Sequence, residues 1–227
     1  MTLAALASGP FVVNAATRLP SGWEWAGLLL SYLLGAVPFG LVIIRLFRGV
    51  DLRRQGSGNI GATNAIRAGG KPLGLLVFAL DVAKGVLPVV LFAPLFAGWG
   101  PRAPETPVAL EVQCGIAAVI GHCFPIYLGF KGGKGVATAC GALIALDWPI
   151  FVAGGLAWLA VMALTRYTGL ASMVMGATFP LAAWLRTTPG QRELFGGSLL
   201  LALLIAVRHR PNIERMLAGT EPKAGRR

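Results

Sequence analysis

Charged residues are scarce in this chain. Asp, Glu, Lys and Arg together make up 13% of its 227 residues, whereas hydrophobic residues make up 56%. A water-soluble domain usually carries about 25% charged residues and has a smaller apolar fraction. The composition therefore excludes an ordinary soluble domain and predicts an integral membrane protein.

Acidic residues are the scarcer of the two charged classes. The chain has 9 Asp and Glu against 20 Lys and Arg, which gives a formal net charge of +11. In a membrane protein such a basic excess is explained by cytoplasmic loops, which concentrate Lys and Arg. We therefore predict no nucleic-acid partner from this charge.

Residues that bind metals or form disulfides are also few. The chain has two histidines and three cysteines, and Cys114, Cys123 and Cys140 lie in apolar sequence without a CxxC spacing. We interpret these cysteines as small buried hydrophobic residues, because free cysteine commonly packs in this way. No group of residues has the spacing of zinc or iron ligands, so we expect no metal and no cofactor.

Long apolar runs dominate what remains. A helix needs about 20 apolar residues to cross a bilayer, and dividing the chain at its charges gives seven candidate spans. The fold class predicted is therefore all-α, a polytopic membrane protein with about seven transmembrane helices. The second span holds Asp81 and Lys84 one helical turn apart, which predicts an internal ion pair. The spans are residues 25–44, 73–96, 108–128, 136–148, 149–164, 170–185 and 194–207, of which the fourth is short enough to be a half-helix or a re-entrant segment.

The basic residues fall mainly on one side of the predicted membrane. Alternating the spans places 15 Lys and Arg in segments 45–72, 129–135, 165–169 and the C-terminal tail, and four on the other face. The positive-inside rule makes the first face cytoplasmic, with the N-terminus outside and the C-terminus in the cytoplasm. Residues 1–22 lack the basic start of a signal peptide. They are an extension of no assigned role, residues 23–220 form a single membrane domain, and residues 221–227 form a basic tail.

The cytoplasmic loops are rich in glycine and free of acid. Segment 56–70 reads GSGNIGATNAIRAGG, and no carboxylate lies between Asp51 and Asp81 or between Glu111 and Asp147. Glycine lets backbone N–H groups approach a ligand closely, so glycine with fixed cations makes an anion site suited to phosphate. In this segment Arg67 supplies a guanidinium fork, and the neutral hydrogen-bonding groups are those of Ser57, Asn59, Thr63 and Asn64.

A second glycine-rich segment, GFKGGKGVAT at 129–138, is similar to a Walker phosphate loop. The Walker spacing fails, because Gly129 is one residue too close to Lys134 and Gly135 stands where Ser or Thr is required. An ATP site is therefore not expected. Lys134 still precedes an apolar helix, which places a cation beside a helix N-terminus.

Two histidines remain as candidates for chemistry. His122, in GHCFP, suits a helix-packing role as well as a functional one. His209 and Asn212 lie one turn apart in RHRPNIER and can face the same site. Glu214 has the spacing of a general-base partner for His209, but an ion pair between Glu214 and Arg210 or another tail arginine is favoured.

Three segments together are similar to a known enzyme family. SGNIGATNAIR, GFKGGKGVAT after GHCFP, and RHRPNIERMLAGTE occur in the order and spacing of the bacterial acyl-phosphate:glycerol-3-phosphate acyltransferases, the PlsY family, over residues 25–220. The resemblance implies a seven-helix fold with all three motifs cytoplasmic. It departs at Gly169, where the family usually has serine. By this resemblance Ser57, Arg67, Lys134, His209 and Asn212 bind glycerol 3-phosphate around the reacting hydroxyl, while Gly132, Gly133 and Ser172 hold the donor phosphate, and Gly58, Asn59 and Asn64 belong to the substrate-binding first motif.

The resemblance also implies the reaction. A fatty acyl group passes from acyl phosphate to the 1-hydroxyl of sn-glycerol 3-phosphate, giving 1-acylglycerol 3-phosphate (lysophosphatidic acid) and phosphate. This is the first step of phospholipid synthesis, at the cytoplasmic face of the bacterial inner membrane. Both reactants are anionic, so a site without carboxylates is expected.

Two alternatives stay open from the sequence. The proton of the attacking hydroxyl can pass to His209 or to the donor's own phosphate. An acyl-enzyme route through Ser57 or Cys123 is disfavoured, because neither residue has a recognisable triad around it. A transporter for a phosphorylated metabolite would also use glycine-broken helices and cations, but all candidate ligands here fall on one face.

Overall fold

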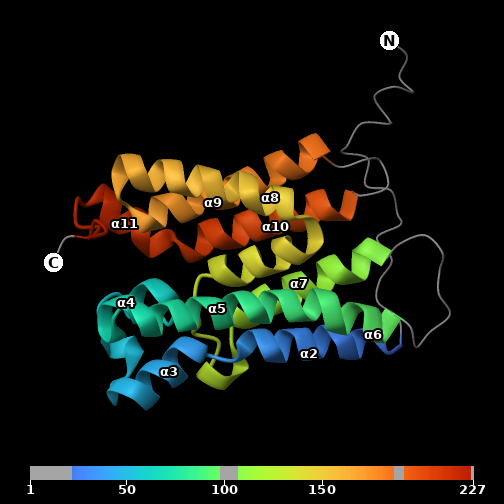
Figure 1. Cartoon of the computed structure of the whole chain (residues 1–227), viewed down its shortest axis with the longest axis horizontal. Helices are drawn as coiled ribbons and strands as arrows, with labels where there is room; N and C mark the ends of the chain where they lie inside the picture. The colour runs from blue at the N-terminus through green and yellow to red at the C-terminus, as the bar shows by residue number, and fades with distance from the viewer. Residues whose placement is uncertain (1–21, 98–106, 187–191, 226–227) are drawn as a thin grey trace, which may run out of the picture.

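The chain is all-α over the residues that the computed structural model describes, 22–97, 107–186 and 192–225. This confirms the all-α part of the predicted fold class. Figure 1 shows the long helices lying roughly side by side, with α3, α4 and α11 at one end of the bundle and α6 at the other. The helices are α2 (Glu24–Ala36), α3 (Phe39–Arg48), η1 (Leu52–Arg54), α4 (Ala62–Gly69), α5 (Lys71–Leu87), η2 (Pro88–Phe92), α6 (Ala93–Ala97), α7 (Pro107–Cys123), η3 (Ile126–Leu128), α8 (Val136–Thr165), α9 (Thr168–Arg186), α10 (Arg192–Arg208) and α11 (Arg210–Leu217).

The helices are long and apolar enough to cross a membrane. Within residues 22–97, 107–186 and 192–225, five stretches meet this description, and α10 with α11 makes a sixth if that pair, bent by 50°, is one span. Large apolar side chains such as Leu29, Leu156 and Leu203 are more than half exposed on these helices. A soluble monomer rarely exposes so much apolar surface, and lipid accounts for it. The five stretches are Glu24–Arg48, Lys71–Ala97, Ala109–Leu128, Val136–Thr165 and Thr168–Arg186.

The first predicted span is broken in the middle. Residues 25–44 were expected to form one helix, but α2 ends at Ala36 and α3 begins at Phe39, with Val37 in an extended conformation. Pro38 is the cause, because proline disfavours the α conformation in the residue before it. The break leaves the Val37 carbonyl without a helical partner, and Lys84 Nζ donates to it at 2.9 Å.

The expected ion pair in the second span is confirmed. Lys84 Nζ lies 2.8 Å from Asp81 Oδ1, and both side chains are almost completely buried. Two opposite charges buried together are far less costly than either one alone. The pair is joined by a residue that the sequence pattern did not connect to it, since His122 Nδ1 lies 3.6 Å from the same oxygen.

The fourth and fifth predicted spans form the two arms of α8. Asp147 has non-helical angles (φ −158°, ψ 91°), and its carboxylate accepts a hydrogen bond from the Ile150 amide at 3.4 Å. Asp147 therefore acts as the N-cap of the second arm, with Pro149 in the first turn, where proline is tolerated. Figure 1 shows the two arms running in opposite directions, so the break at Asp147 reverses the chain.

Small residues allow the helices to pack closely. A Cβ atom on Gly35 would overlap the backbone of Ala118, which joins α2 to α7. Similarly, a Cβ on Gly85 would overlap the Thr138 carbonyl, and one on Gly141 would overlap the Val82 carbonyl. Such contacts are typical of membrane helices, whose backbones approach one another at small residues. The contacts of Gly85 and Gly141 fix α5 against the first arm of α8, which begins directly after the second glycine-rich motif.

Candidate active site

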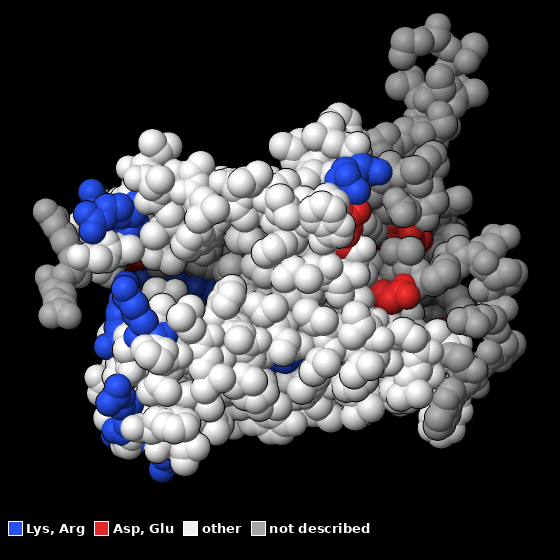
Figure 2. All heavy atoms as spheres, viewed as in Figure 1, with Lys and Arg blue, Asp and Glu red and all other residues white. Residues whose placement is uncertain are grey.

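The three sequence motifs meet at one end of the bundle. Figure 2 shows Lys and Arg gathered at the end where α3, α4 and α11 lie, with a hollow between the two sides that has basic side chains inside it. At the opposite end the visible charges are mostly Asp and Glu. The hollow at the basic end is therefore the candidate active site.

The loop of the first motif is organised by one buried asparagine. Asn64, on α4, is 2% exposed, and its side-chain oxygen accepts from the Ser57 amide at 3.1 Å. Its amide nitrogen lies within 3.1 Å of three backbone carbonyls, those of Leu52, Gln55 and Asn59. All hydrogen bonds described for Asn64 thus go to the loop itself, and Asn64 shapes the loop that carries the predicted ligands.

The other first-motif candidates lie at the surface of this loop and of α4. Ser57, Gly58 and Arg67 are exposed, so their polar groups are accessible to a ligand. Gly58 has φ +69°, a left-handed conformation that glycine adopts without strain. The Asn59 side chain accepts from the Gly61 amide at 2.8 Å and so helps to begin α4.

The second motif is held by an arginine of the third motif that was not among the predicted site residues. Arg208, the last residue of α10, donates to the Gly132 carbonyl at 2.8 Å and to the Gly133 carbonyl at 2.9 Å. Its guanidinium also lies 5.2 Å from the centre of the Phe124 ring. A planar guanidinium fork holds two successive carbonyls in a fixed geometry, whereas the lysine ammonium lacks this rigid arrangement of donors. Arg208 therefore fixes the turn that precedes Lys134.

Lys134 joins the second motif to the third. Its ammonium donates to the Asn212 side-chain oxygen, and the Asn212 amide donates to Glu221 at 2.6 Å. Glu221 also accepts from Arg215 at 2.7 Å. Because the Asn212 amide group is held by Glu221, its oxygen is turned toward Lys134. Two of the predicted site residues, Lys134 and Asn212, are thus in direct contact.

The expectation of a site without carboxylates is wrong. Glu221 enters it, and its side chain is only 6% exposed. The chain turns back after α11, because the Thr220 and Glu221 amides both donate to the Arg215 carbonyl. This turn brings the start of the predicted basic tail into the site. The cations nearby still outnumber this one acid.

The pKa of Lys134 is lowered to about 8, mainly because burial disfavours the charged ammonium. Glu221 opposes this effect, whereas the nearby cations Arg215, Arg67 and Arg208 add to it. Arg67 of the first motif therefore lies within electrostatic range of Lys134. An arriving phosphate would relieve the repulsion among these cations, and so the cluster is suited to an anion.

His209 lies between α10 and α11 and is 2% exposed. Its Nδ1 is 2.8 Å from the Ile205 carbonyl oxygen, which can only accept. We infer that Nδ1 carries the proton and that Nε2 is the acceptor of the neutral ring. The favoured pairing of Glu214 is confirmed, since Arg210 donates to it at 2.8 Å. Glu214 therefore pairs with Arg210 rather than with His209.

An apolar cavity of about 470 Å³ lies beside this cation cluster. It is lined by both arms of α8, from Val136 to Leu159, and by Ser172 of α9. The Trp158 indole donates to the Ser172 hydroxyl at 3.4 Å. Gly169, where a serine was expected by resemblance, packs against the Asn212 side chain, which would lie within about 3 Å of a Cβ there. The cavity and the cation cluster are therefore neighbours.

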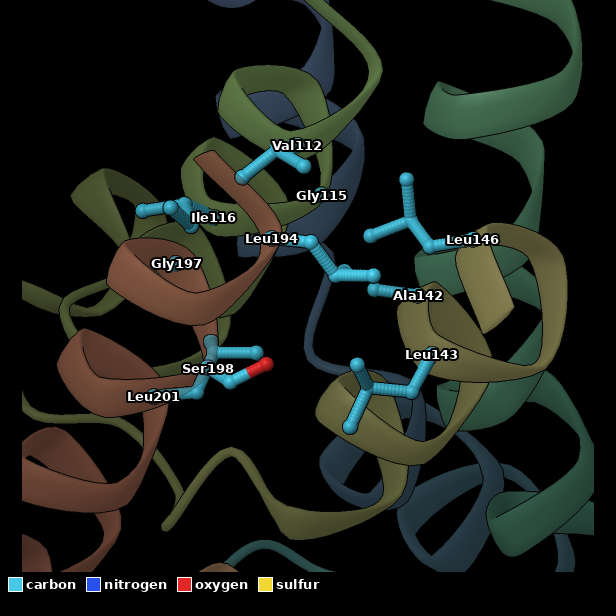
Figure 3. Close-up of a pocket in the computed structure, with 10 residues that line it drawn as sticks. All are labelled: Val112, Gly115, Ile116, Ala142, Leu143, Leu146, Leu194, Gly197, Ser198 and Leu201. Atoms are coloured by element: carbon cyan, nitrogen blue, oxygen red, sulfur yellow. The ribbon is translucent and has the colours of Figure 1, made fainter. Parts of the chain in front are cut away.

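A second, much smaller cavity lies between α7, α8 and α10. Figure 3 shows its lining residues, including the Ser198 hydroxyl. Its volume is about 10 Å³, enough for at most one water molecule. The Ser198 hydroxyl is buried and has no hydrogen-bond partner among the residues that the structure describes. This cavity is too small for a substrate.

Comparisons with known proteins agree with this geometry. The family model described as glycerol-3-phosphate acyltransferase matches residues 25–219. A glycerol-3-phosphate acyltransferase of Dinoroseobacter shibae is 47% identical over 197 residues, covering 87% of this chain and 91% of the relative. One from Rhodospirillum rubrum is 46% identical over 217 residues, covering 94% and 97%.

Solved structures show the same fold. A crystal structure of PlsY (YgiH), an integral membrane glycerol 3-phosphate acyltransferase in its glycerol 3-phosphate form, superposes with a TM-score of 0.79 at 39% identity, covering 90% of this chain and 96% of that one. A lysophosphatidic acid form superposes with a TM-score of 0.78 at 38% identity. With the matched motifs gathered at one end of an apolar helical bundle, the chain belongs to the glycerol-3-phosphate acyltransferase family of integral membrane enzymes.

Proposed function

We propose that the enzyme transfers a fatty acyl group from acyl phosphate to the 1-hydroxyl of sn-glycerol 3-phosphate. The products are lysophosphatidic acid and phosphate, at the first step of phospholipid synthesis. The observation that carries this proposal is the cation cluster of Lys134, Arg67 and Arg215 beside a 470 Å³ apolar cavity. One reactant is a small anion, and the other is an anion with a long apolar tail. A related enzyme solved in a lysophosphatidic acid form supports the product.

The apolar cavity takes the acyl chain in this proposal. Its volume is within the range of about 300–1,000 Å³ that is common for ligand pockets. Val136 and Ser172 line it, close to the second motif. The donor phosphate then lies against the glycine turn of Gly132 and Gly133, whose amides donate to the Cys123 and His122 carbonyls. Its hydrogen-bond donors are the Ser172 hydroxyl and the cations of the cluster.

Glycerol 3-phosphate binds on the other side of the cluster. Its phosphate takes the place of Asn212 as the main partner of Lys134, and Arg67 supplies a second cation. The exposed Ser57 and the loop residues Gly58 and Asn59 surround the glycerol hydroxyls. Asn64 contributes by shaping this loop.

The reaction itself is a single displacement. The 1-hydroxyl oxygen attacks the acyl carbonyl carbon, the bond from that carbon to the phosphate oxygen breaks, and phosphate leaves with the electron pair. Two groups can take the hydroxyl proton, His209 Nε2 and the departing phosphate. Replacing His209 with Ala tests this choice, because only with a histidine base does the variant lose the acidic limb that this ionisation gives to the pH–rate profile. Positioning of the two reactants supplies much of the acceleration.

The orientation follows from the charges at the two ends. Counting the arms of α8 separately, and α10 with α11 as one span, divides the apolar stretches into seven crossings. The basic end, with all three motifs and the C-terminus, faces the cytoplasm, and the N-terminus lies outside. The site then opens to the cytoplasmic side of a bacterial inner membrane. Residues 23–220 form a single catalytic domain, to which Glu221 of the tail is added.

One assay tests the proposed function. Purified enzyme in detergent receives acyl phosphate and radiolabelled glycerol 3-phosphate without coenzyme A, and lysophosphatidic acid and phosphate are both quantified. We expect equal amounts of the two products and no product from an acyl-coenzyme A donor. Uptake of labelled glycerol 3-phosphate into vesicles without any acylated product would favour a transporter and contradict the proposal.

A further inference from the structure

Three ionisable side chains lie in the apolar bundle and have no part in the proposed reaction. Asp81 and Lys84 are on α5, His122 is on α7, and none is more than 4% exposed. Lys84 Nζ is 2.8 Å and His122 Nδ1 is 3.6 Å from the same oxygen of Asp81. Charged groups at membrane depth are costly, and where they occur they commonly serve function. Their surroundings show what this group holds in place.

Lys84 contacts the break between α2 and α3. Its ammonium donates to the Val37 carbonyl at 2.9 Å, and it lies 5.6 Å from the centre of the Phe39 ring. Both contacts are at the break between α2 and α3. Lys84 therefore neutralises Asp81 and donates a hydrogen bond to the carbonyl that the helix break leaves without a helical partner.

His122 faces toward the active site. The Gly133 amide donates to the His122 carbonyl at 3.0 Å, and a Cβ atom on Gly133 would overlap the imidazole at Nε2. One edge of the ring thus lies against the backbone of Gly133, while Nδ1 points toward Asp81. Since Lys134 is the next residue, a rotation of this ring would displace the ammonium.

We propose that Asp81 is a positioning residue for the acyltransfer. Through His122 it fixes the Gly132–Gly133 turn, whose carbonyls accept from Arg208, and it thereby sets the position of Lys134. This inference rests on the proposed function in taking Lys134 as the ligand of the glycerol 3-phosphate phosphate. The ion pair of Asp81 and Lys84 also stabilises the fold. Experiment can separate this structural role from the positioning role of Asp81.

The test replaces both charges of the pair at once. Asp81→Leu and Lys84→Met each leave one unpaired buried charge, so each single variant should be less stable in detergent. The double variant should recover most of that stability, because no buried charge is left unpaired. It still lacks the carboxylate that orients His122. We therefore expect its glycerol 3-phosphate KM to stay raised about tenfold, since small displacements of a binding group have effects of this size or larger.

The binding of glycerol 3-phosphate is measured independently of turnover, as the rise in Tm that this ligand causes. Ser198→Ala is the matched control, because it changes a buried hydroxyl far from the motifs. Wild-type binding and KM in the stable double variant would show that the group only stabilises the fold and would overturn the inference. If wild-type enzyme forms no acylated product, the proposed function fails, while the Tm measurement still decides the inference.

A second pair of variants covers the case in which the double variant does not fold. His122→Asn keeps an N–H donor near the position of Nδ1, whereas His122→Ala removes it. We expect the rise in Tm with glycerol 3-phosphate to persist in the first variant and to be lost in the second. An equal effect in both variants would overturn the inference.

Discussion

The affinity for glycerol 3-phosphate should fall as the pH rises through 8. Burial lowers the pKa of Lys134 from 10.5 to about 8. A lysine binds phosphate in its charged form, and this form is lost above its pKa. With a pKa of about 8, roughly nine tenths of the free enzyme is charged at pH 7 and roughly one tenth at pH 9. Because only the charged fraction is competent, the glycerol 3-phosphate KM should rise about tenfold between these values.

The measurement is a series of glycerol 3-phosphate KM values from pH 7 to 9.5 at saturating acyl phosphate. The substrate phosphate, with a second pKa of about 6, keeps its charge over this range. Lys134→Arg is the matched control, since guanidinium remains charged throughout. Its KM should be nearly constant, even if it is higher than that of the wild type at pH 7. A flat profile in the wild type, or an equal rise in both proteins, would refute the assignment of Lys134.

Three further variants test other parts of the site. Gly155 lines the apolar cavity and has open space around it, so Gly155→Leu should raise the KM for long-chain acyl phosphates but not for short-chain ones. Gly196→Leu, also in open space, is the control. An equal effect on all chain lengths would contradict the placement of the acyl chain. Arg208→Lys should lower kcat/KM about tenfold, because lysine lacks the rigid fork that fixes both carbonyls in one geometry, and wild-type kinetics would show that these two hydrogen bonds are dispensable. Asp147→Ala should lower the free energy of unfolding by about 1 kcal/mol through loss of an N-cap, with wild-type turnover; a loss of activity in the folded variant would oppose a purely structural role.

The sequence predicted the helices better than the breaks within them. The apolar runs located every long helix, and the spacing of Asp81 and Lys84 predicted their ion pair correctly. The break at Val37 was missed because an uncharged run was taken as continuous, although Pro38 was there to disfavour helix. The turn at Asp147 was located to within two residues, since a change of span was expected beside Pro149.

The sequence predicted which residues belong to the site better than it predicted the contacts among them. Lys134 and Asn212 were both candidates, but their hydrogen bond spans 78 residues and no spacing rule shows such a contact. Arg208, the first residue of the third motif, was not predicted as a site residue because its target, the Gly132–Gly133 turn, is remote in sequence. Glu221, the last residue of the third motif, was given no role because the absence of acid was judged along the first two motifs, whereas the turn after α11 brings its carboxylate into the site.

The most direct test is the position of the phosphorus atom in an experimental structure of this enzyme with glycerol 3-phosphate bound. The account predicts that the phosphate lies between Lys134 and Arg67, that Lys134 exchanges its bond to Asn212 for one to the phosphate, and that the glycerol 1-hydroxyl points toward the apolar cavity. A phosphate bound elsewhere, with Lys134 still donating to Asn212, would contradict it.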